Sequence, residues 1–412
     1  MIVPPNSVFE ESKISYYGWI VVGMALLANL MAFGLVYSFG VFLKPLASEY
    51  GWTRSVTTGA FGFYGILHTL LAPFAGRLCD RFGPRLVLTI GGFCLGLPMI
   101  LMVYTTTLWE LYVYYGFLFS IGIAGVYVPV MSTVSQWFKA KRGFAIGLTA
   151  AGLGAGSFVF YPLSAWLITS YGWRKAYAII GILCWVFFIP IVKFMRQVPR
   201  EYKKREELRG LSFSEAFRTE TFWVFGVTWF LGCITIWAIM IHFVPLATDR
   251  GMSMMSAGIL AGIMGATSIF GRISSGFLSD KVGRKRILIT EFSLQLIAFI
   301  WLFFCTKIWM LYLFAVLFGI SSGGWAGVIT AFPADYFGLR ATGSILGFAN
   351  IMAGVGIAMG PYIGGFFFDT THSYDYMVLM CIMGTLGAII SSSLLTPPLK
   401  LLPFRQGEGQ LS

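Results

Sequence analysis

The chain has 412 residues, of which 57% are hydrophobic and only 11% are charged, and its formal net charge is +12. A soluble domain carries about a quarter charged residues, so the composition excludes an ordinary soluble protein and indicates an integral membrane protein. Most Lys and Arg residues fall in one alternate set of loops. The positive-inside rule explains that distribution, so the charge predicts no nucleic-acid partner.

Twelve apolar stretches are each long enough to cross the ~30 Å hydrocarbon core as a helix. In chain order, the predicted membrane-spanning helices are 18–43, 54–78, 86–105, 108–136, 142–170, 175–197, 219–247, 253–280, 286–305, 308–334, 342–368 and 376–396. The residues before the first helix include Glu10 and Glu11 and lack a basic region, so no cleaved signal peptide is expected. The loop charges predict a multi-pass protein of the plasma (inner) membrane, in contact with lipid, with N- and C-termini in the cytoplasm.

The sequence repeats itself at an offset of about 200 residues. PLASEYG recurs as PLATDRG, and GRLCDRFGPR recurs as GFLSDKVGRK. The economical interpretation is an all-α membrane protein of two pseudo-symmetric six-helix bundles. The predicted domains are an N-terminal bundle at 1–198, a cytoplasmic linker at 199–218 and a C-terminal bundle at 219–412. Two such halves around a central site are the general plan of secondary transporters.

The repeated loop motif G-x-x-x-D-x-x-G-[RP]-[RK] resembles that of the major facilitator superfamily, and the resemblance covers essentially the whole chain. The motif supplies the predicted gating residues, namely Gly76, Asp80, Arg85, Gly276, Asp280 and Arg284. Glycine permits close helix approach and a tight turn. The aspartate can pair with loop cations or a helix N-terminus, as a latch that breaks when the cytoplasmic side opens. The alternative is a set of ordinary solvated loop charges.

Arg272 interrupts an apolar helix eight residues before Asp280, about 12 Å into the membrane. A guanidinium at that depth costs at least ~2.5–3.5 kcal/mol on insertion scales, so it requires a wet cavity and an anionic partner. We expect no buried acidic residue to serve, which leaves a substrate carboxylate, bound bidentately. The equivalent position in the first half is Ala72, so a single cation favours a monoanion. The alternative is an arginine held by backbone carbonyls in a structural role.

YYGWIVV in the first helix, WFKAKRGFAIGLTAAGLGAG and the helix 8 arginine resemble the monocarboxylate transporter family and its bacterial relatives, the oxalate:formate antiporter family. The resemblance implies that Arg272 binds the substrate carboxylate and that Tyr37, Tyr127 and Trp325 line the site. Oxalate exchangers carry a lysine in helix 11, which is absent here. Animal monocarboxylate transporters carry a lysine and an aspartate where this chain has Tyr37 and Ser268, so the family's proton-coupling residues are missing.

Three residues are candidates for proton coupling: His68, Arg272 and His242. His68 lies near the middle of the membrane, and histidine titrates in the physiological range, so it is also a candidate for substrate binding. His242 lies near the outer end of its helix and is a candidate for an outer gate or proton path. The alternative for both histidines is a neutral ring bonded to a neighbouring helix. The six cysteines lack CxxC spacing, so we expect no metal and no cofactor other than the co-transported proton.

The sequence predicts a secondary active transporter that couples a small monocarboxylate of the L-lactate/pyruvate type to a proton by alternating access. The nearest alternative is an organic-anion exchanger of the oxalate:formate type. A carboxylate receptor is a further alternative, although the central loop is too short to fold a signalling domain. No G-x-S-x-G or H-E-x-x-H motif is present, so no enzyme is predicted. We expect a monomer, with a dimer as the alternative.

Overall fold

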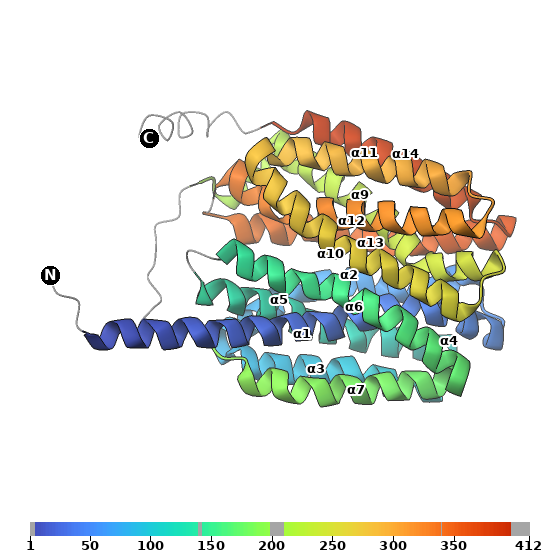
Figure 1. The fold of residues 1–412 in the computed structure, drawn as a ribbon, viewed down its shortest axis with the longest axis horizontal. Helices are drawn as coiled ribbons and strands as arrows, with labels where there is room; N and C mark the ends of the chain where they lie inside the picture. Colours follow the sequence, from blue (N-terminus) through green and yellow to red (C-terminus); the bar gives the residue numbers. More distant parts are fainter. Residues whose placement is uncertain (1–4, 139–141, 198–209, 339, 397–412) are drawn as a thin grey trace.

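The computed structural model describes residues 5–138, 142–197, 210–338 and 340–396, with side chains from residue 16 onwards except at 142. Long helices run side by side along the molecule (Figure 1). In chain order they are α1 (Pro5–Tyr50), α2 (Arg54–Phe82), α3 (Pro84–Leu101), α4 (Leu108–Leu111), α5 (Phe119–Trp137), α6 (Arg142–Tyr171), α7 (Trp173–Phe194), α8 (Phe213–Phe217), α9 (Glu220–Asp249), α10 (Met254–Val282), α11 (Arg284–Phe303), α12 (Ile308–Phe337), α13 (Thr342–Thr371) and α14 (Asp375–Leu394). A short 3-10 helix follows α3, and a π-helical segment joins α4 to α5.

The all-α membrane fold predicted from the sequence is confirmed. In the described part of the chain, 11 helices are long and apolar enough to cross a membrane, with α4 and α5 counted as one. α2 is a further helix of 29 residues at the position of the second predicted span. It falls outside the 11 because its glycines, threonines and His68 lower its mean hydropathy. The first helix begins earlier than predicted, at Pro5.

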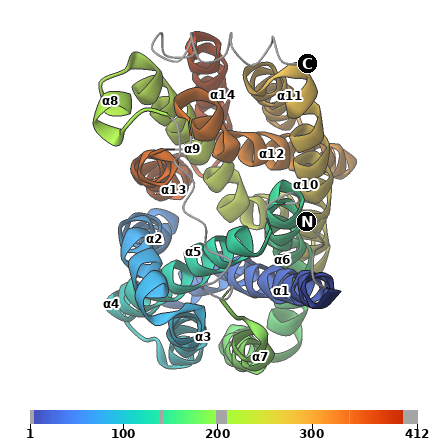
Figure 2. The ribbon, with the colours of Figure 1, turned by 90° about the vertical axis from the view of Figure 1, so that its left-hand side faces the viewer.

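The helices form two groups when viewed along the bundle (Figure 2). α1 to α7 lie on one side and most of α8 to α14 on the other, and the groups meet where α2 packs on α13, α6 on α10 and α1 on α9. We call these groups the first and second halves. The predicted linker 199–218 lies outside the described residues as far as 209, so its limits stay a prediction. The remainder contains α8 and a backbone bridge from Gly210 to Gly338.

The halves are packed unevenly along the bundle. We call the end where α1 begins and α14 ends proximal, and the opposite end distal (Figure 1). Towards the distal end, a Cβ added at Gly365 of α13 would lie 2.6 Å from the backbone nitrogen of Ser55 on α2. Near the proximal end, Gly147 of α6 and Gly347 of α13 have nothing within 4 Å of a Cβ. The structure therefore closes the halves distally and leaves space around the proximal ends of α6 and α13.

Candidate functional site

Arg272 lies on α10, half-buried, where the two halves meet. Its Nη1 donates a hydrogen bond to the carbonyl oxygen of Ala150 on α6 at 3.2 Å. Gly327 of α12 passes over the stem of the side chain, because a Cβ there would lie 3.1 Å from Arg272 Cγ. Within the described ranges no carboxylate forms an ion pair with Arg272. Four of its five N–H donors are therefore free for a ligand.

Two tyrosines of the first half lie close to this guanidinium. Tyr37 of α1 and Tyr127 of α5 are both within electrostatic range of Arg272. Phe33 packs against both, with ring centroids 6.2 Å from Tyr37 and 5.3 Å from Tyr127. Tyr37 also stacks on Trp237 of α9 at 5.6 Å. The structure thus brings together a guanidinium and two phenols in an aromatic surround, a donor set that suits a small carboxylate.

His68 lies on α2 and is only indirectly linked to this group. Its Nδ1–H donates to the carbonyl oxygen of Gly65, one turn earlier, at 3.0 Å. The ring stacks on Tyr64 at 5.1 Å, and Tyr64 in turn lies within electrostatic range of Tyr37. Nε2 has no hydrogen-bond partner in the described part of the chain. His68 is therefore held within its own helix, with one ring nitrogen unused.

Trp325 is not brought together with Arg272. Its side chain is 2% exposed and packs between α9 and α11, stacked on Phe292 at 5.1 Å. The indole Nε1–H donates to Gln295 Oε1 at 2.8 Å. A substrate contact by Trp325 would require this packing and hydrogen bond to break, so in this structure Trp325 is a core residue of the second half.

His242 lies at the distal end of the bundle, where it was expected, and is fully buried. Its Nε2–H donates to the carbonyl oxygen of Pro361 on α13 at 2.8 Å, and Nδ1 lies 3.2 Å from the hydroxyl of Tyr374. The same hydroxyl is hydrogen-bonded to the guanidinium of Arg54 on α2. Burial raises the pKa of Tyr374, so the phenol stays neutral. His242 is thereby connected across the two halves.

Further charged residues complete this cluster, which we call the distal network: Lys44, Arg54, His242, Asp249, Asp369 and Tyr374. Asp249 of α9 binds Lys44 and Arg54, each at 2.7 Å. Asp369 of α13 accepts from the backbone nitrogens of Arg54 and Ser55, each at 2.8 Å. Sequence reasoning missed Arg54 and Asp369 because their charges resemble those of ordinary loops. The network joins α1 and α2 to α9 and α13.

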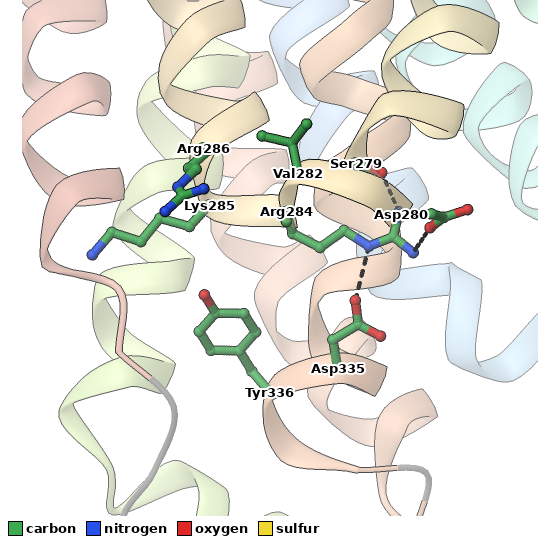
Figure 3. A pocket seen from close by; sticks show the side chains of 9 residues that line it. Ser279, Asp280, Val282, Arg284, Lys285, Arg286, Asp335 and Tyr336 are labelled. Carbon is green, nitrogen blue, oxygen red and sulfur yellow. Dashed lines mark hydrogen bonds and ion pairs between the residues drawn. The ribbon is translucent and has the colours of Figure 1, made fainter. Parts of the chain in front are cut away.

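Three of the predicted gating residues, Arg85, Asp280 and Arg284, bind partners within their own halves. In the second half, Arg284 pairs with Asp280 and with Asp335 of α12, each at 2.8 Å, beside a surface hollow of about 500 Å³ (Figure 3). In the first half, Arg85 donates to the carbonyl oxygens of Lys193 and Met195 at the end of α7.

The glycines that end α2 and α10 have positive φ, +86° at Gly83 and +99° at Gly283. That backbone region favours glycine, so each motif forms the tight turn expected of it. Gly76 and Gly276 lie in the same two helices, four residues before Asp80 and Asp280. A Cβ added at Gly276 would have no atom within 4 Å. Asp80 forms no ion pair among the described residues. A latch between the halves at this end stays a prediction.

One buried acid lies in the second half, at a position that the sequence analysis did not single out. Glu291 of α11 is 8% exposed, and the hydroxyl of Ser275 on α10 donates to its Oε1. Glu291 was not singled out from the sequence, which predicted only that no buried acid serves Arg272. Within the described ranges Glu291 forms no ion pair with Arg272. The available signal was a single acid in the mostly apolar stretch that follows the basic first turn of its helix.

The comparisons with known proteins agree with this architecture. The sequence model of the Major Facilitator Superfamily matches residues 25–361, with a second match at 275–410. The chain belongs to the major facilitator superfamily. Members of this superfamily and the relatives described next are transporters, so the chain is a transporter and not an enzyme.

Several relatives of this major facilitator protein cover most of its length. The uncharacterized MFS-type transporter YcxA of Bacillus subtilis is 28% identical, over 84% of this chain and 87% of the relative. Monocarboxylate transporter 11 of Mus musculus is 25% identical, over 89% of this chain and 84% of the relative. Monocarboxylate transporter 13 of Rattus norvegicus is 26% identical, over 87% of this chain and 84% of the relative.

A solved structure shares the fold. It is a bacterial homologue of the human lysosomal transporter Spinster, in an inward-facing and unoccupied conformation, with a TM-score of 0.72. It covers 92% of this chain and 95% of its own, at 16% identity, so the likeness shows the fold alone.

Proposed function

We propose that this transporter carries a small monocarboxylate of the L-lactate/pyruvate type together with a proton. The observation that carries the proposal is Arg272, a guanidinium between the halves with one hydrogen bond to protein and no carboxylate partner in the described chain. Tyr37 and Tyr127 add two phenols within electrostatic range of it. Monocarboxylate transporters among the relatives support this substrate class.

Coupling to a proton is supported by energetics. A lone anion that enters a cell against a 100 mV inside-negative potential must overcome about 2.3 kcal/mol. An anion carried with a proton crosses without net charge and avoids that cost. A unit of pH difference then supplies about 1.4 kcal/mol, which is roughly tenfold accumulation. The non-protein partners that this proposal requires are the substrate, the co-transported proton and the surrounding lipid.

The distribution of Lys and Arg supports a cytoplasmic proximal end in the plasma (inner) membrane, with both chain termini on that side. In that orientation the distal network closes the outer side, and the space around Gly147 and Gly347 faces the cytoplasm. Alternating access would then exchange this arrangement for one that opens distally, by rocking of the six-helix halves as a monomer.

The test is uptake of labelled L-lactate into proteoliposomes, with and without an inside-alkaline pH gradient. We expect gradient-stimulated uptake by the wild type and its loss in Arg272→Ala. Arg218→Ala is the matched control, because Arg218 is exposed at the proximal side of the second half and makes no ion pair within the described ranges. Uptake only against preloaded oxalate or formate would replace symport with exchange of the oxalate:formate type.

A further inference from the structure

Glu291 occupies an unusual place in the second half. It lies seven residues after α11 begins at Arg284, about 10 Å along the helix from the proximal end. Its carboxyl packs directly against the backbone of α12, since a Cβ at Gly324 would lie 2.4 Å from Glu291 Cδ. Oε1 accepts from Ser275, whereas Oε2 is buried without a hydrogen-bond partner.

An ionised carboxylate at this place is poorly compensated. It has one hydroxyl donor, and no Lys, Arg or His in the described chain lies within ion-pair distance. Burial of an unpaired charge costs several kcal/mol of free energy, and burial of the neutral acid costs much less. An ionisable side chain inside a membrane helix is retained at that cost chiefly where it serves transport.

The neighbouring charged and titratable groups leave Glu291 isolated. On α10 the nearest is Arg272, one turn from Ser275, and Asp280 and Lys281 lie beyond at the proximal end. On α12, Asp335 and Tyr336 lie near the proximal end and Tyr312 near the distal end. On α14, Cys381 is bonded to the carbonyl oxygen of Thr235, and Asp375 and Tyr376 lie at the distal end. On α11 itself, Arg284, Lys285 and Arg286 lie in the first turn.

Two independent contacts place this carboxyl one helical turn from Arg272. On α10, Ser275, which binds Glu291, is three residues after Arg272. On α12, Gly324 faces Glu291 and Gly327, three residues later, faces Arg272. Positions three apart on a helix lie on the same face. The acid and the substrate-binding cation therefore border the same two helices of one half.

We propose that Glu291 is the residue that takes up the co-transported proton, an inference that rests on the proposed symport function. With Arg272 empty, its positive charge favours the ionised carboxylate of Glu291. A substrate carboxylate on Arg272 cancels that charge and favours the acid form. The carboxylate then gains one proton from water on the side where substrate enters and releases it with the substrate on the other side. Proton and anion would be bound and released together.

The test compares net uptake with exchange in Glu291→Gln, whose amide imitates the protonated acid. Net uptake needs the empty carrier to release its proton, whereas exchange of labelled for unlabelled lactate uses the loaded carrier only. We expect net gradient-driven uptake to fall at least about tenfold while exchange stays within about twofold of the wild type. Glu220→Gln is the matched control, an exposed carboxylate in the first turn of α9 that should change neither rate.

Each outcome decides the proposal. Net uptake that survives in Glu291→Gln overturns it while leaving symport intact, and loss of both net uptake and exchange in folded protein assigns Glu291 a structural role. A wild type without gradient-driven uptake overturns the proposed function itself. If Glu291→Gln does not fold, Glu291→Asp decides. Its shorter carboxyl loses Ser275, so net uptake should persist with a displaced pH profile, and an unchanged profile would overturn the proposal.

Discussion

Arg54 of α2 and Asp249 of α9 form an ion pair of 2.7 Å that joins the two halves at the distal end. The Arg54 guanidinium lies 3.5 Å from the centre of the Phe368 ring, and its side chain is 11% exposed. Lys44 binds the other oxygen of Asp249 but is more exposed, so it contributes little. In the alternating access proposed above, a partly buried pair between the two halves stabilises only the state in which they meet. The distal network therefore favours the distally closed state.

Asp249→Asn should shift the protein towards the distally open state. The amide keeps the shape but loses the charge, and a loss on the order of 1 kcal/mol changes the ratio of states about fivefold. The measurement is the maleimide labelling rate of Thr58→Cys, a buried position behind the network, in a background without the native cysteines. Asp375→Asn, an exposed distal carboxylate, is the control. Equal labelling rates in both variants would show that the ion pair does not hold the halves together.

Arg272→Lys should weaken substrate binding although it keeps the positive charge. Lysine presents a point charge and loses the planar fork that binds a carboxylate through two hydrogen bonds. We expect KM for L-lactate to rise about 10- to 100-fold, which corresponds to about 1.4–2.8 kcal/mol. Initial uptake rates across a range of concentrations measure this change. An unaltered KM would mean that charge alone recruits the substrate and that Arg272 makes no bidentate contact.

Much of the fold could be predicted from the sequence, because its signals are local. Each predicted span coincides with a helix, and Gly83 and Gly283 end α2 and α10 in the tight turns that the repeated motif predicts. α2 shows the limit of hydropathy. Its polar and glycine residues make it less apolar than the other long helices, yet it lies against α13 in the contact between the halves.

The site could be predicted only in part, because a helical span does not reveal which way each residue faces. Arg272 was visible as one charge in an apolar helix, and resemblance supplied Tyr37 and Tyr127. Trp325 was assigned to the same group, but its orientation depends on Gln295, thirty residues earlier in the chain. Glu291 was missed because its burial depends on the absence of a side chain at Gly324 on another helix. Both the orientation of Trp325 and the burial of Glu291 depend on contacts between different helices, which the sequence of a single helix does not reveal.

Tyr37→Phe and Trp325→Phe should separate substrate contact from packing. Removal of the Tyr37 hydroxyl takes a donor from beside Arg272, so KM should rise several-fold, or about 1 kcal/mol. Trp325→Phe leaves the Oε1 atom of buried Gln295 unpaired, so the melting temperature should fall while KM stays within about twofold. Uptake kinetics and thermal unfolding of both purified variants measure the difference. A raised KM in Trp325→Phe at unchanged stability would instead bring Trp325 into contact with substrate.

Gly324→Ala should displace the Glu291 carboxyl, whereas Gly347→Ala should be tolerated. A Cβ at Gly324 would lie 2.4–2.7 Å from three atoms of that carboxyl group, so the side chain or the helix must move, at a cost of about 1–3 kcal/mol. Gly347 has open space around it, and alanine is favoured over glycine inside a helix by roughly 0.5–1 kcal/mol. Melting temperatures in detergent should therefore fall for Gly324→Ala and hold or rise for Gly347→Ala. Equal melting temperatures would show that the carboxyl is not confined against α12, which would remove the geometric basis for its isolation from water.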